Sequence, residues 1–386
     1  MDMNRSGVHL RQDERIGWVD LLRVLSCFLV VFAHCCDPFV AQFDQDRASF
    51  LTGAFSGSLV RSSVPLFVMM TGVLLLPVQR GMADFYRKRI GRIIVPLIFW
   101  SIALPILFFV YLNYIQPHSA NAALPADGFT PQATGVKLYT FIFNFNFDTT
   151  PLWYLYMLVG LYLILPILSA WLERATKREI RLFLWVWGAT LLLPYLRMIA
   201  PMLGYAGNYG HMGLFGECDW NLYGTFYYVS GFIGYLVLAH YLVLYPPAWS
   251  WRKTLCIVVP MFVMGYLITA LGYVWFQKQY PGNYAYLEIV WYFTGINVFV
   301  MTYAVFVVIR KLNLKPSRWL ANLASLTFGI YLCHFIFVHV AYDCFAEFGS
   351  MPYFLRIVCM ACSAFVVSGV IVWVMKRWKV TRRLVV

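Results

Sequence analysis

Three ionisable residues lie within the first long apolar run of this 386-residue chain. Asp20 and Arg23 are three residues apart, so they share one face of a helix and can pair. His34 follows Arg23 by eleven residues, which places both on one stripe, about 16 Å apart along the helix axis. A histidine at that depth is a candidate base, because its proton exchanges near neutral pH. The alternative is an ion pair at the inner membrane interface and a histidine at the outer one.

A pair of arginines is the second candidate site. Arg89 and Arg92 are three residues apart at the start of another apolar run, and they face the same way. Paired guanidinium groups suit phosphate, since each can donate a bidentate pair of hydrogen bonds. Basic residues at the inner end of a helix are also what membrane topology alone requires, so the spacing leaves both interpretations open.

A second histidine lies deep in a later apolar run. Tyr331 and His334 share a helix face, and His334 lies about 21 Å from the inner end of that helix. This height is similar to that of His34. We therefore expect His34 and His334 to border one polar cavity. His339, five residues further on, is expected near the outer surface and in contact with solvent.

The elements that hold these side chains follow from composition. The chain is 61% hydrophobic and 12% charged, whereas a soluble domain is about 45–50% apolar and about 25% charged. The excess apolar surface must face lipid, and apolar runs of about 20 residues are long enough to cross a bilayer. We predict an all-α, polytopic membrane protein whose spans lie near 18–36, 56–77, 93–114, 152–171, 182–203, 223–245, 254–276, 286–309, 320–343 and 354–375.

Charge placement predicts the orientation. Most of the 30 lysines and arginines fall in alternate loops and in the two terminal tails, which places the N-terminus and C-terminus in the cytoplasm. We expect a cytoplasmic tail over 1–16, a transmembrane domain over 17–376 and a second tail over 377–386. No cleavable signal peptide is expected, because the first sixteen residues are polar and no small-residue cleavage site follows the first apolar run. The positive-inside arrangement accounts for the net charge of +13, so a nucleic-acid partner is not needed to explain it. The basic inner face should instead attract anionic membrane lipids.

The cysteines give no sign of a metal site. Most of the nine cysteines lie inside apolar runs, and no Cys-x-x-Cys or Cys/His ligand spacing occurs. Cys218 and Cys344 fall in or near predicted outer loops, where they could pair in an oxidising compartment. The segment 115–151 and the glycine-rich segment 204–222 are also predicted outside the membrane. A loop as long as 115–151 is more often functional than idle.

Five motifs in order resemble the acyltransferase family 3 of integral membrane acyltransferases, and among these the bacterial surface-polysaccharide O-acetyltransferases. They are Trp18 to Arg23 followed by His34, Arg61 to Gly72 ("VPLFF…SG"), Phe85 to Pro96 with its Arg-x-x-Arg, Leu152 to Leu155 with Tyr162 ("HLWFL…Y"), and Ser325 to His334 ("SYGIYLxH"). Pro151 stands where many members have histidine, so a role for that histidine cannot be transferred. Thr71 replaces the usual serine before Gly72, and we expect no hydrolase-like domain fused after the last span.

The resemblance implies a function and a role for each site residue. The donor would be acetyl-CoA or another acyl-CoA from the cytoplasm, and the acceptor a hydroxyl of a cell-surface or lipid-linked glycan. Arg89 and Arg92 would hold the CoA phosphates, and His34 would be the general base or a transient acyl carrier. Arg23 would orient the acyl-CoA, with Asp20 fixing Arg23. The substrate pocket would be lined by Trp153, Tyr331 and His334, and no metal is expected.

Two other functions remain open from the residues alone. Deep Asp, Arg and His side chains also serve proton-coupled transporters or exporters of lipids and glycans. No paired broken helices or internal repeat supports that interpretation. A catalytically silent scaffold in a glycan assembly complex is the third possibility. The resemblance implies that the protein lies in a bacterial cytoplasmic (inner) membrane.

Overall fold

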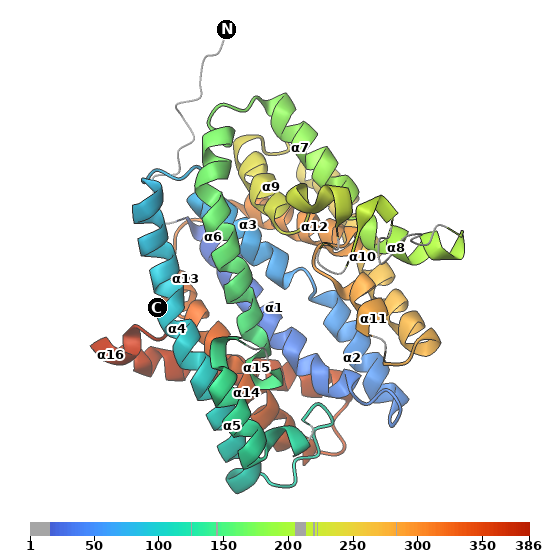
Figure 1. Ribbon diagram of the computed structural model, residues 1–386, viewed down its shortest axis with the longest axis vertical. Coiled ribbons are helices and arrows are strands. Elements are labelled where there is room, and N and C mark those ends of the chain that lie inside the picture. The colour runs from blue at the N-terminus through green and yellow to red at the C-terminus, as the bar shows by residue number, and fades with distance from the viewer. Residues whose placement is uncertain are drawn as a thin grey trace. The chain divides into compact units, whose positions relative to one another are not determined.

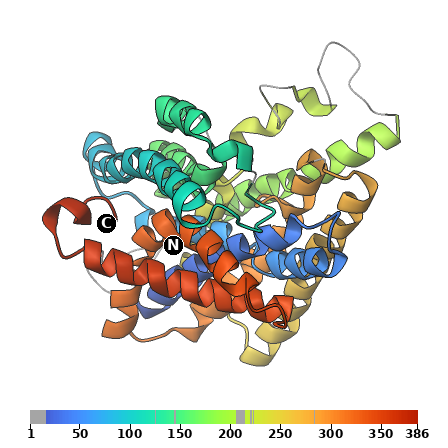
Figure 2. The same cartoon turned by 90° about the horizontal axis from the view of Figure 1, so that it is seen from below.

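The computed structural model describes residues 16–124, 126–143, 146–204, 214–218, 221, 223–282 and 284–386. The tail before residue 16 and most of the predicted outer segment 204–222 lie outside these residues. Within them the chain is helical, with no strand beyond an isolated bridge between Cys218 and Asn221. Figures 1 and 2 show the helices in two views.

The predicted all-α membrane fold is confirmed. In the described part of the chain, ten helical segments are long and apolar enough to cross a membrane. Several exceed the predicted runs at one end because polar residues continue the same helix beyond the apolar stretch. The segments are Gly17–Val40, Arg47–Leu75, Met82–Ile115, Pro131–Leu172, Lys177–Ala200, Gly224–Leu244, Trp251–Gln279, Ile289–Leu312, Thr327–Ala346 and Tyr353–Met375.

The chain divides into two compact units. The first contains residues 1–22, 64–78 and 165–321, and the second contains 23–63, 79–164 and 322–386. Unit boundaries fall within the helices α1 (Gly17–Val40), α6 (Trp153–Leu172) and α13 (Arg318–Ala324), and at the first residue of α3 (Ser63–Leu75).

The first unit is built on close helix contacts. It holds α3 (Ser63–Leu75), α7 (Lys177–Thr190), α8 (Leu193–Met202), α9 (Ile233–Leu244), α10 (Trp251–Gln279), α11 (Tyr284–Trp291) and α12 (Ile296–Leu312). Here α10 packs along α12, and α7 packs along α9. Gly72 of α3 meets the backbone of α9 so closely that an added Cβ would lie 2.6 Å from the Leu236 carbonyl oxygen. The glycine of the "VPLFF…SG" motif is therefore required for packing.

The second unit holds the candidate active site. It contains α2 (Arg47–Leu59), α4 (Met82–Val110), α5 (Pro131–Thr140), α14 (Thr327–Ala346), α15 (Tyr353–Met375) and α16 (Lys379–Arg382). The red helices α14 and α15 pack along each other, and α14 also contacts α4 (Figure 2). The predicted C-terminal tail packs against this unit, since the Trp100 indole donates a hydrogen bond of 3.0 Å to the Leu384 carbonyl.

Four predicted spans are each divided into two α-helices: α2 and α3, α7 and α8, α11 and α12, and α13 and α14. Two of these breaks have a local cause. Between α2 and α3 the break lies at Val60 to Ser62. Pro65 explains it, because the proline ring clashes with the carbonyl of the residue four positions earlier. Between α13 and α14 the break lies at Ser325, whose hydroxyl donates to the Asn322 carbonyl at 2.7 Å. Such local side-chain bonds compete with helical ones.

The predicted long outer loop 115–151 is partly helical. Thr130 caps α5 by accepting a hydrogen bond from the Ala133 amide at 3.2 Å, and Pro131 occupies the first turn, where a missing N–H costs nothing. Short 3-10 turns follow at Phe141–Phe143 and Phe147–Leu152. The segment therefore forms an ordered cover that packs on α4 and α14.

Candidate active site

His34 is held by a carboxylate on its own helix. On α1 the Nδ1 atom of His34 lies 2.8 Å from Oδ2 of Asp37, and the two side chains are 19% and 38% exposed. An ionised carboxylate only accepts hydrogen bonds, so Nδ1 carries the proton. The other ring nitrogen, Nε2, then has a free lone pair for proton transfer. Asp37 was not identified from the sequence as a partner of His34. The spacing of three residues, which places both side chains on one helix face, could have indicated it.

His334 lies beside His34, as the matched heights of the two residues predict. The two imidazole centroids are 5.4 Å apart, and His34 also meets the ring of Phe335 at 5.1 Å. His334 is fully buried, and its Nδ1 lies 2.7 Å from the Tyr331 carbonyl oxygen. Its Nε2 has no hydrogen-bond partner among the described residues. The two helices α1 and α14 therefore bring together two imidazoles, each with one nitrogen fixed.

The expected position of His339 is wrong. This side chain is completely buried rather than solvated. Its Nδ1 lies 2.8 Å from the Asn121 side-chain amide, and the rings of Phe335 and Phe147 lie 4.8 and 5.6 Å away. The cause is the outer segment, which folds over the end of α14 and covers it. That segment has no helical or strand periodicity from which the cover could be predicted.

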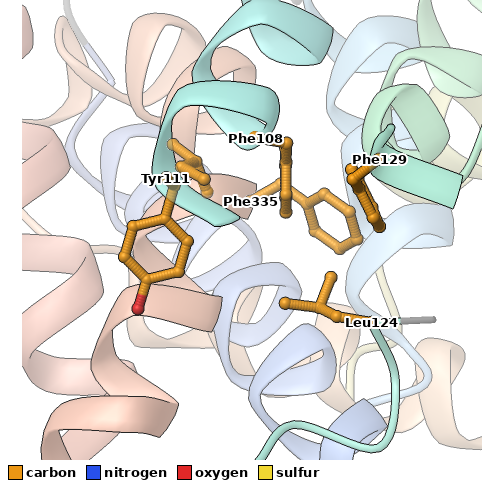
Figure 3. Packing of buried hydrophobic residues seen from close by; sticks show 6 residues of the cluster. Phe108, Tyr111, Leu124, Phe129 and Phe335 are labelled. Atoms are coloured by element: carbon orange, nitrogen blue, oxygen red, sulfur yellow. The ribbon is translucent and has the colours of Figure 1, made fainter. Parts of the chain in front are cut away.

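An apolar cluster seals this end of the site. Figure 3 shows Phe108 of α4 and Phe129 beside Phe335, with Leu124 from the outer segment below them. Phe108 stacks on Phe129 at 5.6 Å and meets Phe335 at 5.8 Å. Such packing keeps water from the imidazoles and strengthens the electrostatic interactions between the groups around them. Tyr111, the residue that follows α4, belongs to the same cluster, and its hydroxyl donates a hydrogen bond to Asp343 of α14 at 2.7 Å.

The segment around Pro151 contacts the site through its backbone. The hydroxyl of Tyr331 donates a hydrogen bond to the Pro151 carbonyl, and its ring meets Tyr154 at 5.5 Å. Trp153, predicted for the substrate pocket, packs against Tyr154 with ring centroids 6.3 Å apart. Tyr154 of this motif therefore reaches Tyr331. Where many family members have histidine, this chain supplies a proline carbonyl instead.

Asp20 and Arg23 lie near the start of α1. Both are partly buried. Eleven residues separate Arg23 from His34, so the guanidinium and the imidazole follow one stripe of the helix about 16 Å apart along its axis. The helix is continuous over this distance. A charged group and a base are thus arranged at two depths of the same helix.

Arg89 and Arg92 form a basic cluster near the start of α4. Arg89 is half-buried and Arg92 is exposed. Lys88 lies close enough to repel both of them, and Arg80 lies close enough to repel Arg89. Within the residues described, neither arginine forms an ion pair, and the nearby Asp84 pairs weakly with Arg87 at 3.9 Å. The arginines therefore remain available for an anion. Sixteen residues along α4 from Arg92 lies Phe108, about 24 Å away.

In the described part of the chain, no group of three or more His, Cys, Asp or Glu side chains could hold a metal ion. Cys218 and Cys344 are both free thiols, so the disulfide considered for them is absent.

The fold defines a multi-pass membrane protein in which the imidazoles of His34 and His334 come together from two helices, α1 and α14. A family model described as an acyltransferase domain matches residues 16–373. The chain therefore belongs to acyltransferase family 3, and its activity is acyl transfer. The match includes both histidines, the Asp37 carboxylate and the paired arginines of α4. Comparisons with curated proteins and with solved structures gave no match.

Proposed function

We propose that this protein transfers an acetyl or short acyl group from acyl-CoA to a hydroxyl of a cell-surface or lipid-linked glycan. The observation that carries the proposal is the carboxylate-bound imidazole of His34, with His334 beside it, in a chain of an acyltransferase family. Acyl transfer to a hydroxyl needs a base to take the hydroxyl proton, and a histidine positioned by a carboxylate suits that task.

His34 acts at the bond-forming step. Its Nε2 takes the proton of the acceptor hydroxyl as the oxygen attacks the thioester carbonyl carbon. The carbon–sulfur bond then breaks, and the departing CoA thiolate takes the proton from the imidazolium. Asp37 stabilises the imidazolium through Nδ1–H. In the alternative order, His34 itself attacks the thioester, carries the acyl group and passes it to the hydroxyl.

Arg89 and Arg92 hold the phosphates of the donor. Their guanidinium groups lack acidic partners among the described residues, and an anion with several phosphates compensates the repulsion between them. The long pantetheine arm of CoA then bridges the distance from these phosphates to the reacting thioester. Arg23 orients the thioester end, and Asp20 fixes Arg23.

His334, Tyr331 and Trp153 border the acceptor. His334 has an unused buried nitrogen for a sugar hydroxyl, and aromatic side chains stack well on sugar rings. The outer segment over α14 covers this side of the site. Family membership favours acyl transfer over the export of a lipid or glycan.

The proposal includes one orientation in the membrane, which rests on the distribution of basic residues along the chain. Both termini and the basic cluster of α4 face the cytoplasm, where acyl-CoA is made, and the acceptor glycan is presented on the opposite side. The host membrane is a bacterial cytoplasmic membrane.

Isothermal titration of CoA and acetyl-CoA against the purified full chain tests the donor site. We expect saturable binding by the wild type that is lost in an Arg89→Ala/Arg92→Ala variant. Arg87→Ala is the matched control, because Arg87 is an exposed arginine of the same helix that already pairs with Asp84. Absence of CoA binding by well-folded wild type would remove the acyl-CoA donor from the account.

A further inference from the structure

A cavity of about 330 Å³ lies in the first unit, where three helix ends meet. They are the last residues of α9, the first of α10 and the last of α12. The cavity is lined by Leu242, Thr254, Phe306, Val307, Arg310 and Lys311, among others. No residue of the candidate active site contributes to it.

Two cations of α12 form one wall of this cavity. The Arg310 guanidinium carbon lies 5.3 Å over the Trp18 ring, and its Nε is buried without a hydrogen-bond partner among the described residues. Lys311 donates to the Trp249 carbonyl and lies 5.3 Å over the Trp251 ring. In the part of the chain that the structure describes, neither side chain has an acidic partner. Two uncompensated positive charges thus face one hollow.

Cations at a helix C-terminus also stabilise the helix dipole, and this is the simpler explanation of Arg310 and Lys311. An exposed charge is enough to stabilise a helix dipole. A buried hydrogen-bond donor without an acceptor, in contrast, destabilises the protein by about 1–3 kcal/mol. The position of Arg310 is therefore unfavourable unless an acceptor enters the cavity. The helix dipole therefore explains why cations lie at the end of α12, but it does not explain why the Nε of Arg310 is buried beside the cavity.

Part of the lining is apolar, with Leu242 from α9 and with Phe306 and Val307 from α12, one turn before the two cations. Leu242, Phe306 and Val307 are all buried, with exposed fractions of 4%, 0% and 5%. The helix ends that form the cavity also mark a membrane boundary, because α9, α10 and α12 are three of the predicted spans. A ligand at this place must combine a negative group with an apolar body.

We propose that this cavity binds the phosphate group of an anionic amphiphile. The phosphate accepts hydrogen bonds from Arg310 and Lys311, and the apolar part lies against Leu242, Phe306 and Val307. The volume is at the lower end of the range for small-molecule sites, about 300–1,000 Å³, which fits a headgroup and the start of a chain. The phosphate group can come from a membrane lipid or from a free phosphate compound. The proposal is independent of the acyl-transfer mechanism.

Native mass spectrometry of the full chain in detergent tests the proposal with three probes: dioleoyl phosphatidylglycerol, dioleoylglycerol and inorganic phosphate. We expect phosphatidylglycerol to bind the wild type, and dioleoylglycerol, which lacks the phosphate, to bind at least about tenfold more weakly. Competition by inorganic phosphate would show that the group is recognised without a lipid chain. No competition would assign the site to the lipid.

An Arg310→Gln/Lys311→Gln variant should bind phosphatidylglycerol at least about tenfold more weakly. The matched control is Lys315→Gln/Arg318→Gln, which removes the same charge from two exposed residues just beyond α12 and should bind like the wild type. Lys311→Gln alone, which keeps the Arg310–Trp18 contact, should show a smaller loss in the same direction and guards against misfolding of the double variant. Equal losses in both double variants, or no saturable binding by the wild type, would overturn the proposal.

Discussion

Replacing Asp37 with asparagine tests the positioning of the proposed base. The substitution keeps the size of the side chain but removes the charge that the His34 imidazolium needs. The hydrogen bond between them is 2.8 Å long, and a bond to a charged group contributes about 1.5–3 kcal/mol. Because Asp37 is 38% exposed, solvent screens the pair, and we take about 1.5–2 kcal/mol. That corresponds to a fall in kcat of about 10- to 30-fold.

The assay measures release of free CoA thiol from acetyl-CoA by the purified protein in liposomes with the native envelope fraction as acceptor. KM for acetyl-CoA should be unchanged, because Asp37 contacts the base and not the donor. Asp44→Asn is the matched control, since Asp44 is an exposed carboxylate just beyond α1 and its loss should leave kcat unchanged. Wild-type kcat in Asp37→Asn, with His34→Ala inactive, would refute the reasoning and leave His34 acting without a carboxylate.

Three further outcomes concern the fold. Gly72→Ala should destabilise the protein by about 1–3 kcal/mol, because its Cβ would lie 2.6 Å from a carbonyl oxygen of α9. Gly160→Ala, whose Cβ would meet nothing within 4 Å, should be neutral in the same unfolding experiment. Asn121→Ala should cost about 1–3 kcal/mol by leaving the buried His339 Nδ1 unpaired, and an unchanged midpoint would contradict that contact. A tyrosine hydroxyl of α15 and two backbone amides hold the pKa of Asp46 below its ordinary value, so its stabilisation is present at neutral pH and lost as pH falls through that lowered pKa. In Asp46→Asn, the melting temperature should therefore be lower at neutral pH and depend less on acid than in the wild type.

The membrane fold was largely predictable because apolar length is a strong signal. The ten predicted apolar runs correspond to ten candidate spans among the described residues, because a helix needs about 20 apolar residues to cross the hydrocarbon layer. The start of α4 at Met82 was not predictable from apolarity, because its first turns are charged and lie at the membrane edge. The break between α2 and α3 could have been predicted from Pro65, because proline disrupts the preceding helical turn.

The candidate site was only half predictable. Helix periodicity placed Arg23 and His34 on one stripe and matched the heights of His34 and His334. It could not show that His339 is buried, because burial there depends on an irregular segment distant in sequence that folds over α14. Asp37 was within reach of the same periodicity and was overlooked because it lies at the polar end of the run.

Transfer of radiolabelled acetyl from acetyl-CoA to the envelope glycan by His34→Ala tests the central claim most directly. His118→Ala, at an exposed histidine of the outer segment, is the matched control. The account predicts that His34→Ala loses about 10²–10⁴-fold in transfer rate, the contribution of a general base, while CoA binding and the melting temperature stay at wild-type values. Wild-type transfer by a folded His34→Ala protein would contradict the account.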